Sequence, residues 1–403
     1  MPPLRNLHAF LTYARRTLTT PVSQRPSPLT FVVGNESGDL DSLCSAVLFA
    51  YFRSLAAPKF TLHIPLANIP REDLALRPEL RAALAYAGVK SEDLLTLTDL
   101  EEIKDLKPDD TRWLLVDHNA LTGSLAERFG ARTVGCVDHH EDENFIPKST
   151  GDEPRVLQKT GSCMSLVVEY CQDVFDGLSK HGDTTEDGDD VKDLENGLAR
   201  VALAPILIDT NNLKSKAKTT DLDIKIAEYL ETKVNNYKRK TYYTELSELK
   251  EDISQFSYTD NFRKDFKAWT EAGMVLGTSS IPKGFHYMLK HLGDDKTLLE
   301  DFRKFSEDRK VDIGTIMTSS AKDDGVFKRN LLVWAFNAKA VKAVENFMAS
   351  QAEALGLAPF QDGRLDYKGE NEVRYCWYQH VTKNSRKQLA PMLRAAMREA
   401  AKL

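Results

Sequence analysis

The first half of this 403-residue chain alternates between short apolar runs and segments with helical spacing of apolar positions. The apolar runs at residues 31–33, 60–66, 112–117 and 132–138 predict strands, and residues 155–158 allow another. Between them, apolar residues three and four positions apart predict helices. Strands that alternate with helices are typical of a mainly parallel, doubly wound α/β sheet. We therefore expect this fold in the N-terminal half.

The second half predicts a smaller α/β domain with a mixed sheet. Strands are expected at residues 273–281, 311–319, 330–336 and 372–380, and helices near residues 283–291, 298–305 and 340–355. A charged, tyrosine-rich stretch suits a connecting helix between the halves. We thus predict a first domain over residues 1–236, a linker helix over 237–257 and a second domain over 258–403.

Residues 176–197 interrupt the regular pattern. Between Asp183 and Glu195 there are seven acidic residues and a single lysine, with little apolar content. The spacing of the acids does not fit a calcium-binding loop. We interpret this segment as a mobile, solvated surface insertion in the first domain.

The N-terminus allows two interpretations. Residues 1–35 contain no Asp or Glu but carry four arginines, and their leucines and Phe10 lie on helical spacing. This is typical of a mitochondrial transit peptide, but also of an amphipathic helix that packs on the first strand. We favour the folded helix, and so a cytoplasmic protein, with a mitochondrial location as the alternative.

Composition narrows the classes of partner. The chain is 42% hydrophobic and 28% charged, which is ordinary for a globular protein. Its net charge of −6 argues against binding to nucleic acid or to anionic membranes through bulk charge. Its five cysteines form no CxxC pair, and no apolar run approaches 18 residues. We expect buried free thiols and no transmembrane helix.

Polar residues gather where predicted strands and helices end. Asn35, Asp39 and Asp41 follow the first strand, Asp117 ends another, His139 and His140 follow Asp138, and Asp209 ends an apolar helix over 197–209. Carboxylates with one or two imidazoles suit Mg²⁺ or Mn²⁺. They suffice for two such cations about 3.5–4 Å apart, which would lower the pKa of a bridging water and direct a hydroxide at phosphorus.

Four motifs carry a family resemblance. GNESGDLDS, VDHN, VDHH and LIDTNNLKSKA occur in this order, and SRKQLAP follows near the C-terminus. Together they resemble the DHH phosphoesterases: the fungal cytosolic exopolyphosphatases and prune proteins first, and the manganese pyrophosphatases next. The resemblance covers nearly the whole chain. It implies a DHH domain, a DHH-associated second domain that binds substrate, and an active site in the cleft between them.

The resemblance also implies roles for individual residues. Asp39 and Asp117 would hold one divalent cation, and Asp41, Asp117, His139 and Asp209 the other, so that Asp117 bridges the two. Asp138 would orient a histidine, and His140 would face the substrate as a hydrogen-bond donor or proton source. The pyrophosphatases have a histidine in the place of Asn35, so Asn35 is expected as a ligand that favours Mg²⁺.

Basic residues are expected to bind the phosphate chain. Arg386 and Lys387 match the signature of the second domain and would contact substrate. Lys214, Lys216 and Lys218 follow Asp209 and either extend this track or form an ordinary solvated loop.

We therefore predict a monomeric, metal-dependent exopolyphosphatase, which removes the terminal phosphate of inorganic polyphosphate. A prune-like short-chain polyphosphatase or pyrophosphatase is an alternative. A DHH nuclease or cyclic-dinucleotide phosphodiesterase is another, although those usually carry a GGGH signature that this chain lacks. A non-enzymatic scaffold is a fourth, against which the complete set of ligand candidates argues.

Overall fold

The computed structural model of the chain describes residues 6–180, 188–321 and 326–402. It divides into two compact units, Met1–Lys250 and Glu251–Leu403. The two units are built on separate sheets, and the predicted metal ligands all belong to the first.

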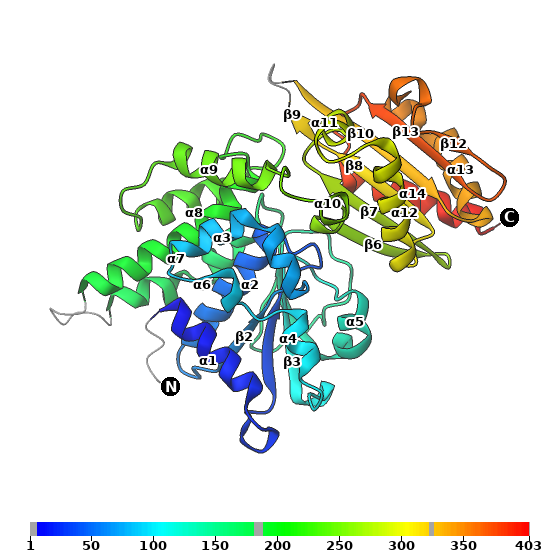
Figure 1. Cartoon of the computed structure of the whole chain (residues 1–403). Coiled ribbons are helices and arrows are strands. Elements are labelled where there is room, and N and C mark those ends of the chain that lie inside the picture. The colour runs from blue at the N-terminus through cyan, green and yellow to red at the C-terminus, as the bar shows by residue number, and fades with distance from the viewer. Residues whose placement is uncertain (1–5, 181–187, 322–325, 403) are drawn as a thin grey trace. The chain divides into compact units, whose positions relative to one another are not determined.

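The first unit contains a five-stranded parallel sheet with the order β2-β1-β3-β4-β5. Two of its strands, β2 and β3, are labelled in Figure 1. The strands are β1 (Leu29–Val33), β2 (His63–Leu66), β3 (Thr111–Val116), β4 (Thr133–Asp138) and β5 (Arg155–Leu157). This confirms the predicted parallel sheet. Because β2 and β3 lie on opposite sides of β1, the winding direction reverses there, and ligands of such sheets bind at the carboxyl ends of strands at this point.

Helices cover both faces of this sheet. They are α1 (Leu7–Thr19), α2 (Leu40–Leu55), α3 (Pro78–Ala85), α4 (Leu97–Glu102), α5 (Gly123–Phe129), α6 (Cys163–Lys180), α7 (Gly188–Asp209), α8 (Asp221–Glu231) and α9 (Arg239–Glu251). The side chains of each strand alternate between two cores. Val32 and Leu114 pack with α2, α6 and α7, whereas Phe31 and Trp113 pack on the other face with α5.

Two close contacts hold β1 against β3 and against the start of α2. The rings of Phe31 and Trp113, which are partners in the β1–β3 register, stack with centroids 4.7 Å apart. At the end of β1, a Cβ on Gly34 would lie 2.7 Å from the Cβ of Ser42 in α2. Glycine therefore lets the first turn of α2 approach the strand end, where the polar residues follow.

The acidic segment differs from its prediction. Residues 176–180 belong to α6 and residues 188–197 to α7, so these residues are helical where an irregular segment was expected, and residues 181–187 lie outside the described part of the chain. Lys233 pairs with Asp176 at 3.0 Å and with Glu195 at 3.3 Å, and the Tyr229 hydroxyl donates to Asp176 at 2.7 Å. Lys233, which follows α8, and Tyr229, which lies on it, therefore pair with acidic residues of this segment that looked unpaired in the sequence.

The second unit contains a mixed sheet with the order β11-β13-β10-β8-β7-β6, in which only the β7–β8 pair is parallel along that path. Its strands are β6 (Phe266–Glu271), β7 (Met274–Ile281), β8 (Ile313–Thr318), β9 (Ser320–Ala321), β10 (Phe327–Ala335), β11 (Leu357–Pro359), β12 (Tyr367–Lys368) and β13 (Val373–Gln379). Its helices are α10 (Tyr258–Lys264), α11 (Phe285–His291), α12 (Asp295–Asp308), α13 (Ala338–Leu355) and α14 (Arg386–Ala400). One core lies under α13 and α14, and another under α10 to α12. The predicted mixed sheet is confirmed.

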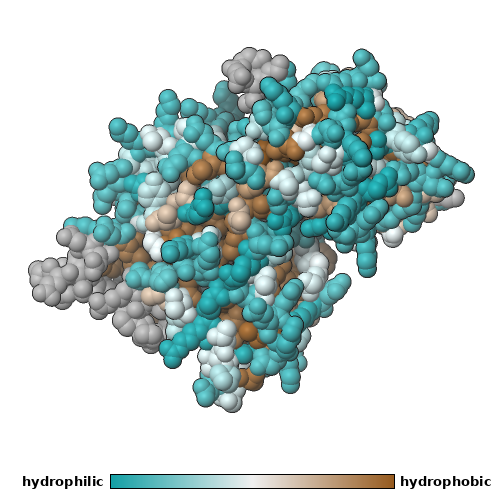
Figure 2. All heavy atoms as spheres, in the orientation of Figure 1, coloured by the Kyte–Doolittle hydropathy of each residue, from teal (hydrophilic) through white to brown (hydrophobic). Residues whose placement is uncertain are grey.

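Apolar side chains are largely enclosed in these cores. Hydrophilic residues cover most of the face seen in Figure 2, and apolar residues show in smaller areas between them. Within the described part of the chain, no helix combines the length and apolar character needed to span a membrane.

The N-terminal helix α1 contributes to the core formed by Val32, Leu114, α2, α6 and α7. Leu7, Phe10 and Leu11 are buried with α2, and the rings of Phe10 and Tyr51 meet edge to face at 5.4 Å. The folded, amphipathic interpretation of this segment therefore describes the structure.

Truncation of the buried ring on α1 should test this packing. We expect Phe10→Ala to lower the free energy of unfolding by about 3–5 kcal/mol, because it removes a fully buried ring and leaves a cavity. Urea unfolding measures the change, with the exposed neighbour His8→Ala as a control. An unchanged Phe10→Ala midpoint would mean that α1 does not contribute to the folded core.

Candidate metal centre

The predicted ligands come from separate elements that end at one edge of the parallel sheet. Asn35 and Asp39 lie between β1 and α2, and Asp41 lies in the first turn of α2. Asp117 follows β3, Asp138 ends β4, and His139 and His140 come next. Asp209 is the last residue of α7, as the sequence predicts.

Asp117 occupies the middle of this group. Its side chain is 3% exposed, and its Oδ2 accepts hydrogen bonds from Asn35 Nδ2 at 2.8 Å and Ser42 Oγ at 2.5 Å. Its φ of 60° is in the left-handed region, which is uncommon for residues other than glycine and is least costly for Asn and Asp. The backbone N–H of Asp117 donates to Val137 O at 3.1 Å, which holds this turn against β4.

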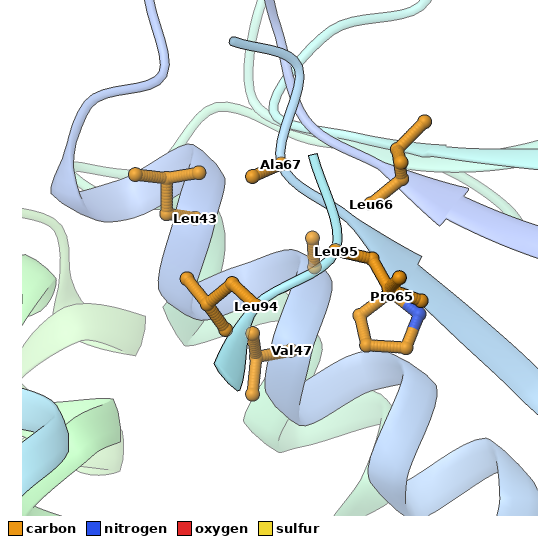
Figure 3. Close-up of a pocket in the computed structure, with 8 residues that line it drawn as sticks. Leu43, Val47, Pro65, Leu66, Ala67, Leu94 and Leu95 are labelled. Carbon is orange, nitrogen blue, oxygen red and sulfur yellow. The ribbon is translucent and has the colours of Figure 1, made fainter. Parts of the chain in front are cut away.

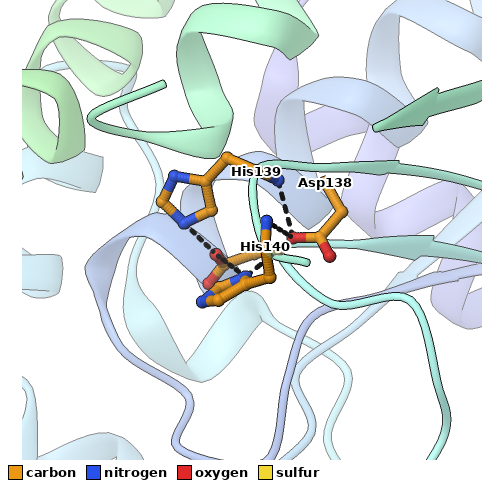
Figure 4. Close-up of side chains that lie close together, drawn as sticks. Asp138, His139 and His140 are labelled. Atoms are coloured by element: carbon orange, nitrogen blue, oxygen red, sulfur yellow. Dashed lines mark hydrogen bonds and ion pairs between the residues drawn. The ribbon is translucent and has the colours of Figure 1, made fainter. Parts of the chain in front are cut away.

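Four ionisable side chains form a compact cluster at the ends of β3 and β4. Ligand atoms of Asp117, Asp138, His139 and His140 all lie within 4.8 Å of one another. In Figure 4 the two histidine rings lie at a steep angle to each other, and their centroids are 4.5 Å apart. Asp138 Oδ1 accepts from His140 Nδ1 at 2.8 Å and from the backbone N–H of His139 at 2.7 Å.

Asp138 remains ionised. Burial alone would raise the pKa of this carboxyl, but hydrogen bonds from His140 and Asn119 outweigh burial and hold its pKa at about 2. The Asn119 Nδ2 donates to Asp138 Oδ2 at 2.6 Å. A carboxylate that accepts from His140 Nδ1 keeps a proton on that nitrogen and fixes the ring, so Nε2 is the nitrogen that can act on another group.

The contact between His139 and Asp117 has the chemistry of a metal site. His139 Nδ1 lies 3.0 Å from the carbonyl oxygen of Thr160, so Nδ1 must donate. In the neutral ring, Nε2 then has a lone pair, yet it lies 3.1 Å from Asp117 Oδ1, which is also an acceptor. Two donor atoms that bind one cation at right angles, each at about 2.1 Å, are about 3.0 Å apart. The residues therefore fit a divalent cation that both atoms ligate.

Asp41 is held by the start of α6. Its Oδ1 accepts from Ser162 Oγ at 2.9 Å and Met164 N at 3.0 Å, and its Oδ2 accepts from Cys163 N at 2.6 Å. The Gly161-Ser162 helix start thus binds an anion, as such helix ends do, and the anion is the Asp41 carboxylate of the chain itself. Sequence reasoning did not identify these amide contacts, because residues 41 and 162–164 are far apart in the chain.

Uncompensated negative charge remains at the site. Burial, and then the charges of Asp117 and Asp209, raise the pKa of Asp41 well above its ordinary value. Burial is also the main reason that the pKa of Asp209 rises to about 6, and Lys250 and Lys218 oppose the rise. Carboxyls with raised pKa values are stabilised by cations, which agrees with the donor set above.

Asn35 fits the predicted role of a metal ligand less well than the carboxylates do. Its Oδ1 accepts from Ser37 N at 3.0 Å and from Ser37 Oγ at 2.5 Å, which occupies both lone pairs. Its Nδ2 donates to Asp117. In this structure the amide therefore supports the Asp117 carboxylate instead of offering an oxygen to a cation.

The predicted substrate-binding residues are placed as follows. Lys214, Lys216 and Lys218 are exposed in the loop after α7, and Lys218 and Lys250 both act electrostatically on Asp209. In the second unit, Lys387 is exposed, whereas Arg386 donates to Asp265 O at 3.0 Å and to Asp265 Oδ1 at 2.8 Å. Sequence reasoning missed Lys250, which lies near the end of α9 and carried no motif. A phosphate-binding role for Arg386 would require its guanidinium to leave or share Asp265.

A small cavity beside α2 is not a second candidate. It has a volume of about 10 Å³ and is lined by apolar side chains that include Leu43, Val47 and Leu94 (Figure 3). It offers no polar side chain to an anion, and it barely has room for one water molecule.

Comparison with known proteins identifies the family. The model of the DHH family N-terminal domain matches residues 30–206, and that of the DHHA2 domain matches residues 244–396. The Schizosaccharomyces pombe protein named "Putative exopolyphosphatase" is 32% identical over 94% of this chain and 94% of its own length. The chain therefore belongs to the DHH family.

More distant relatives agree with this assignment. Exopolyphosphatase PRUNE1 of Rattus norvegicus is 25% identical over 93% of this chain and 76% of its length. A manganese-dependent inorganic pyrophosphatase of Methanocaldococcus jannaschii is 25% identical over 63% of this chain and 71% of its length. The crystal structure of the "Methanococcus jannaschii putative family II inorganic pyrophosphatase" matches with a TM-score of 0.56 and 19% identity, over 92% of this chain and 99% of that one, which shows the shared fold.

The raised pKa values of Asp41 and Asp209 predict a pH-dependent effect of metal. In the metal-free protein, the protonated Asp209 carboxyl favours folding at low pH, and this contribution is lost as pH rises through about 6; the raised pKa of Asp41 acts in the same direction. A divalent cation must displace those protons, so its affinity should increase over the same range. We expect Mn²⁺ to raise the melting temperature more at pH 7.5 than at pH 5.5, relative to EDTA-treated protein.

Thermal scans at several pH values measure this difference. Asp142, an acid in the loop after His140, provides the control: the melting temperatures of Asp142→Asn should follow those of the unaltered chain. Asp209→Asn should flatten the pH dependence. A stabilisation by Mn²⁺ that is equal at both pH values would contradict proton displacement at these carboxyls.

Proposed function

We propose that this DHH family protein is a metal-dependent exopolyphosphatase that hydrolyses the terminal phosphoanhydride bond of inorganic polyphosphate. The observation that carries the proposal is the pair formed by His139 Nε2 and Asp117 Oδ1, 3.1 Å apart, with Nδ1 fixed as a donor to Thr160. In the neutral ring both atoms of the pair are acceptors that a divalent cation can ligate, whereas a protonated ring would donate Nε2–H to Asp117. The names of the relatives supply the reaction class.

The proposed ligand sets follow the positions of the carboxylates. Asp39 and Asp117 would hold one cation, and Asp41, Asp117, His139 and Asp209 the other. Asn35 and Ser42 donate to Oδ2 of Asp117, so Oδ1, which faces His139, is the oxygen that would serve the shared position. When bound, two divalent cations lower the pKa of a water held between them and neutralise charge on the phosphate oxygens. The ions are proposed as Mg²⁺ or Mn²⁺, because the donors are mostly oxygens with one imidazole.

His140 is proposed to move a proton. Its Nδ1–H donates to the ionised Asp138, which fixes the ring, and 30% of its side chain is exposed. Its Nε2 would then donate to the oxygen that leaves the terminal phosphorus. General acid catalysis of this kind contributes about 10²–10⁴-fold to the rate.

Exposed cations would bind the remainder of a polyphosphate chain. Lys218 is in electrostatic range of Asp209, with Lys214 and Lys216 in the same loop, and Lys387 is exposed on the second unit. Polyphosphate carries about one negative charge for each phosphate, so its affinity should fall as the salt concentration rises. Arg386 is proposed as a further contact that exchanges Asp265 for phosphate.

Pyrophosphate hydrolysis is a second candidate function. It is favoured by the similarity to the manganese-dependent pyrophosphatase from M. jannaschii. The departure at Asn35, where we would expect a histidine in that group, argues against it, because both polar atoms of Asn35 are engaged by Ser37 and Asp117.

The function is tested by hydrolysis of a panel of substrates, followed as release of phosphate from the phosphoanhydrides and as the linear nucleotide product from the dinucleotide. Long-chain polyphosphate, tripolyphosphate, pyrophosphate and a cyclic dinucleotide should be assayed with Mg²⁺ and with Mn²⁺, and with EDTA as the blank. We expect the rate of metal-dependent hydrolysis of long-chain polyphosphate to exceed the rate for each of the other three substrates. Faster cleavage of pyrophosphate, or of the dinucleotide, would replace the proposed substrate.

A single charge change should separate catalysis from folding. We expect Asp117→Asn to lower kcat at least about a hundredfold, because it removes a carboxylate shared by both cation sites and places an amide N–H₂ among donors. Circular dichroism should show an unchanged fold, and Asp142→Asn serves as the control. Near-normal activity of a folded Asp117→Asn protein would contradict the assignment of Asp117 as the shared ligand.

A further inference from the structure

Asp223 is a fully buried carboxylate that the proposed reaction does not use. It lies in the first turn of α8 and is 0% exposed. It accepts five hydrogen bonds. Two come from Thr220 N and Thr220 Oγ1, both at 2.8 Å, which form the cap of α8. The other three come from the segment that begins α6: Gly161 N at 2.8 Å, Ser162 N at 3.4 Å and Ser165 Oγ at 2.6 Å.

The segment that Asp223 holds is the one that orients two proposed metal ligands. Ser162 Oγ, Cys163 N and Met164 N all donate to the Asp41 carboxylate. Two residues before Ser162, the carbonyl oxygen of Thr160 accepts from His139 Nδ1 at 3.0 Å. This contact sets which nitrogen of that ring faces Asp117. Asp41 and His139 come from different elements, and residues 160–164 are a structure that they share.

The segment also packs against Thr210, the residue that follows a third ligand candidate. A Cβ on Gly161 would lie 2.5 Å from Thr210 Cγ2 and 2.9 Å from Asp223 Oδ2. Thr210 directly follows Asp209. Glycine at this position therefore allows residues 160–164, Asp223 and the end of α7 to meet without a side chain between them.

We propose that Asp223 is a positioning residue for the metal centre, which sets the affinity for divalent cations by fixing residues 160–164 against Asp41 and His139. The proposal rests on the ligand assignment above. Asp223 does not touch the cations or the substrate. Its charge matters because every one of its five partners is a donor, and an ionised carboxylate is the side chain that only accepts. Groups that orient metal ligands in this way typically change metal affinity by about 10–100-fold when they are altered.

The alternative role for Asp223 is to cap α8 only, and a matched pair of variants separates the two roles. Asp223→Asn keeps the shape but replaces one carboxylate oxygen by an N–H₂, which faces backbone N–H donors at either position, Ser162 at Oδ1 or Gly161 and Thr220 at Oδ2. Thr220→Ala removes the hydroxyl contact of the same cap and leaves the contacts to Gly161, Ser162 and Ser165 unaltered. Mn²⁺ binding to each protein is measured by electron paramagnetic resonance of the free ion, alongside the melting temperature.

We expect Asp223→Asn to weaken Mn²⁺ binding at least tenfold, while Thr220→Ala lowers the melting temperature and binds Mn²⁺ within twofold of the unaltered chain. If Asp223→Asn does not fold, Ser165→Ala replaces it, since that variant loses one contact to Asp223, and we expect at least threefold weaker binding. Affinity that is unchanged in the folded acid or serine variant, or lowered equally by Thr220→Ala, would overturn the positioning role. Failure of the unaltered chain to bind Mn²⁺ would instead overturn the proposed function.

Discussion

Repulsion among carboxylates at one edge of the parallel sheet is the constraint on which this site depends. Two like charges about 4 Å apart repel by about 4 kcal/mol at an effective dielectric constant of about 20, whereas the end of a helix offsets about 0.3–2 kcal/mol. The amides that begin α6 hold Asp41, and Lys250 and Lys218 act on Asp209, yet burial, together with the charges of Asp39 and Asp117, still raises the pKa of Asp209 to about 6. Fixed protein groups thus offset only part of the charge. Divalent cations offset the rest most simply, and this requirement for metal is the core of the proposed function.

The fold explains why the carboxylates meet. All five strands of the first sheet run parallel, so the residues after β1, β3 and β4 emerge at the same edge. Hydrogen bonds then give each side chain one orientation: Asn35 and Ser42 hold Asp117, Asp138 holds His140, and Thr160 holds His139. These hydrogen bonds restrict the side chains of Asp117, His139 and His140, which reduces the conformational entropy that they lose when a ligand binds.

Sequence reasoning recovered the strands next to the site because each is a short apolar run that ends at a charged residue, and it placed Asp209 at the end of its helix. It missed β6, whose residues are all partly or fully exposed and which therefore lacks an apolar run. It did not predict that residues 176–180 and 188–196 are helical, and it missed the partners of Asp176 and Glu195, since Lys233 and Tyr229 lie later in the chain. Contacts that no local sequence pattern reveals also explain three other sites. Ser37 hydrogen-bonds to Asn35, Asp265 pairs with Arg386, and Asp41 accepts from the amides at the start of α6.

The central claim is that two divalent cations occupy the carboxylate cluster. Crystals grown with Mn²⁺ and measured at the manganese absorption edge test it directly through anomalous scattering. We expect two peaks about 3.5–4 Å apart, with Asp117 between them, Asp39 beside one, and Asp41, His139 and Asp209 around the other. A single peak, peaks outside this cluster, or Asp117 in contact with neither ion would contradict it.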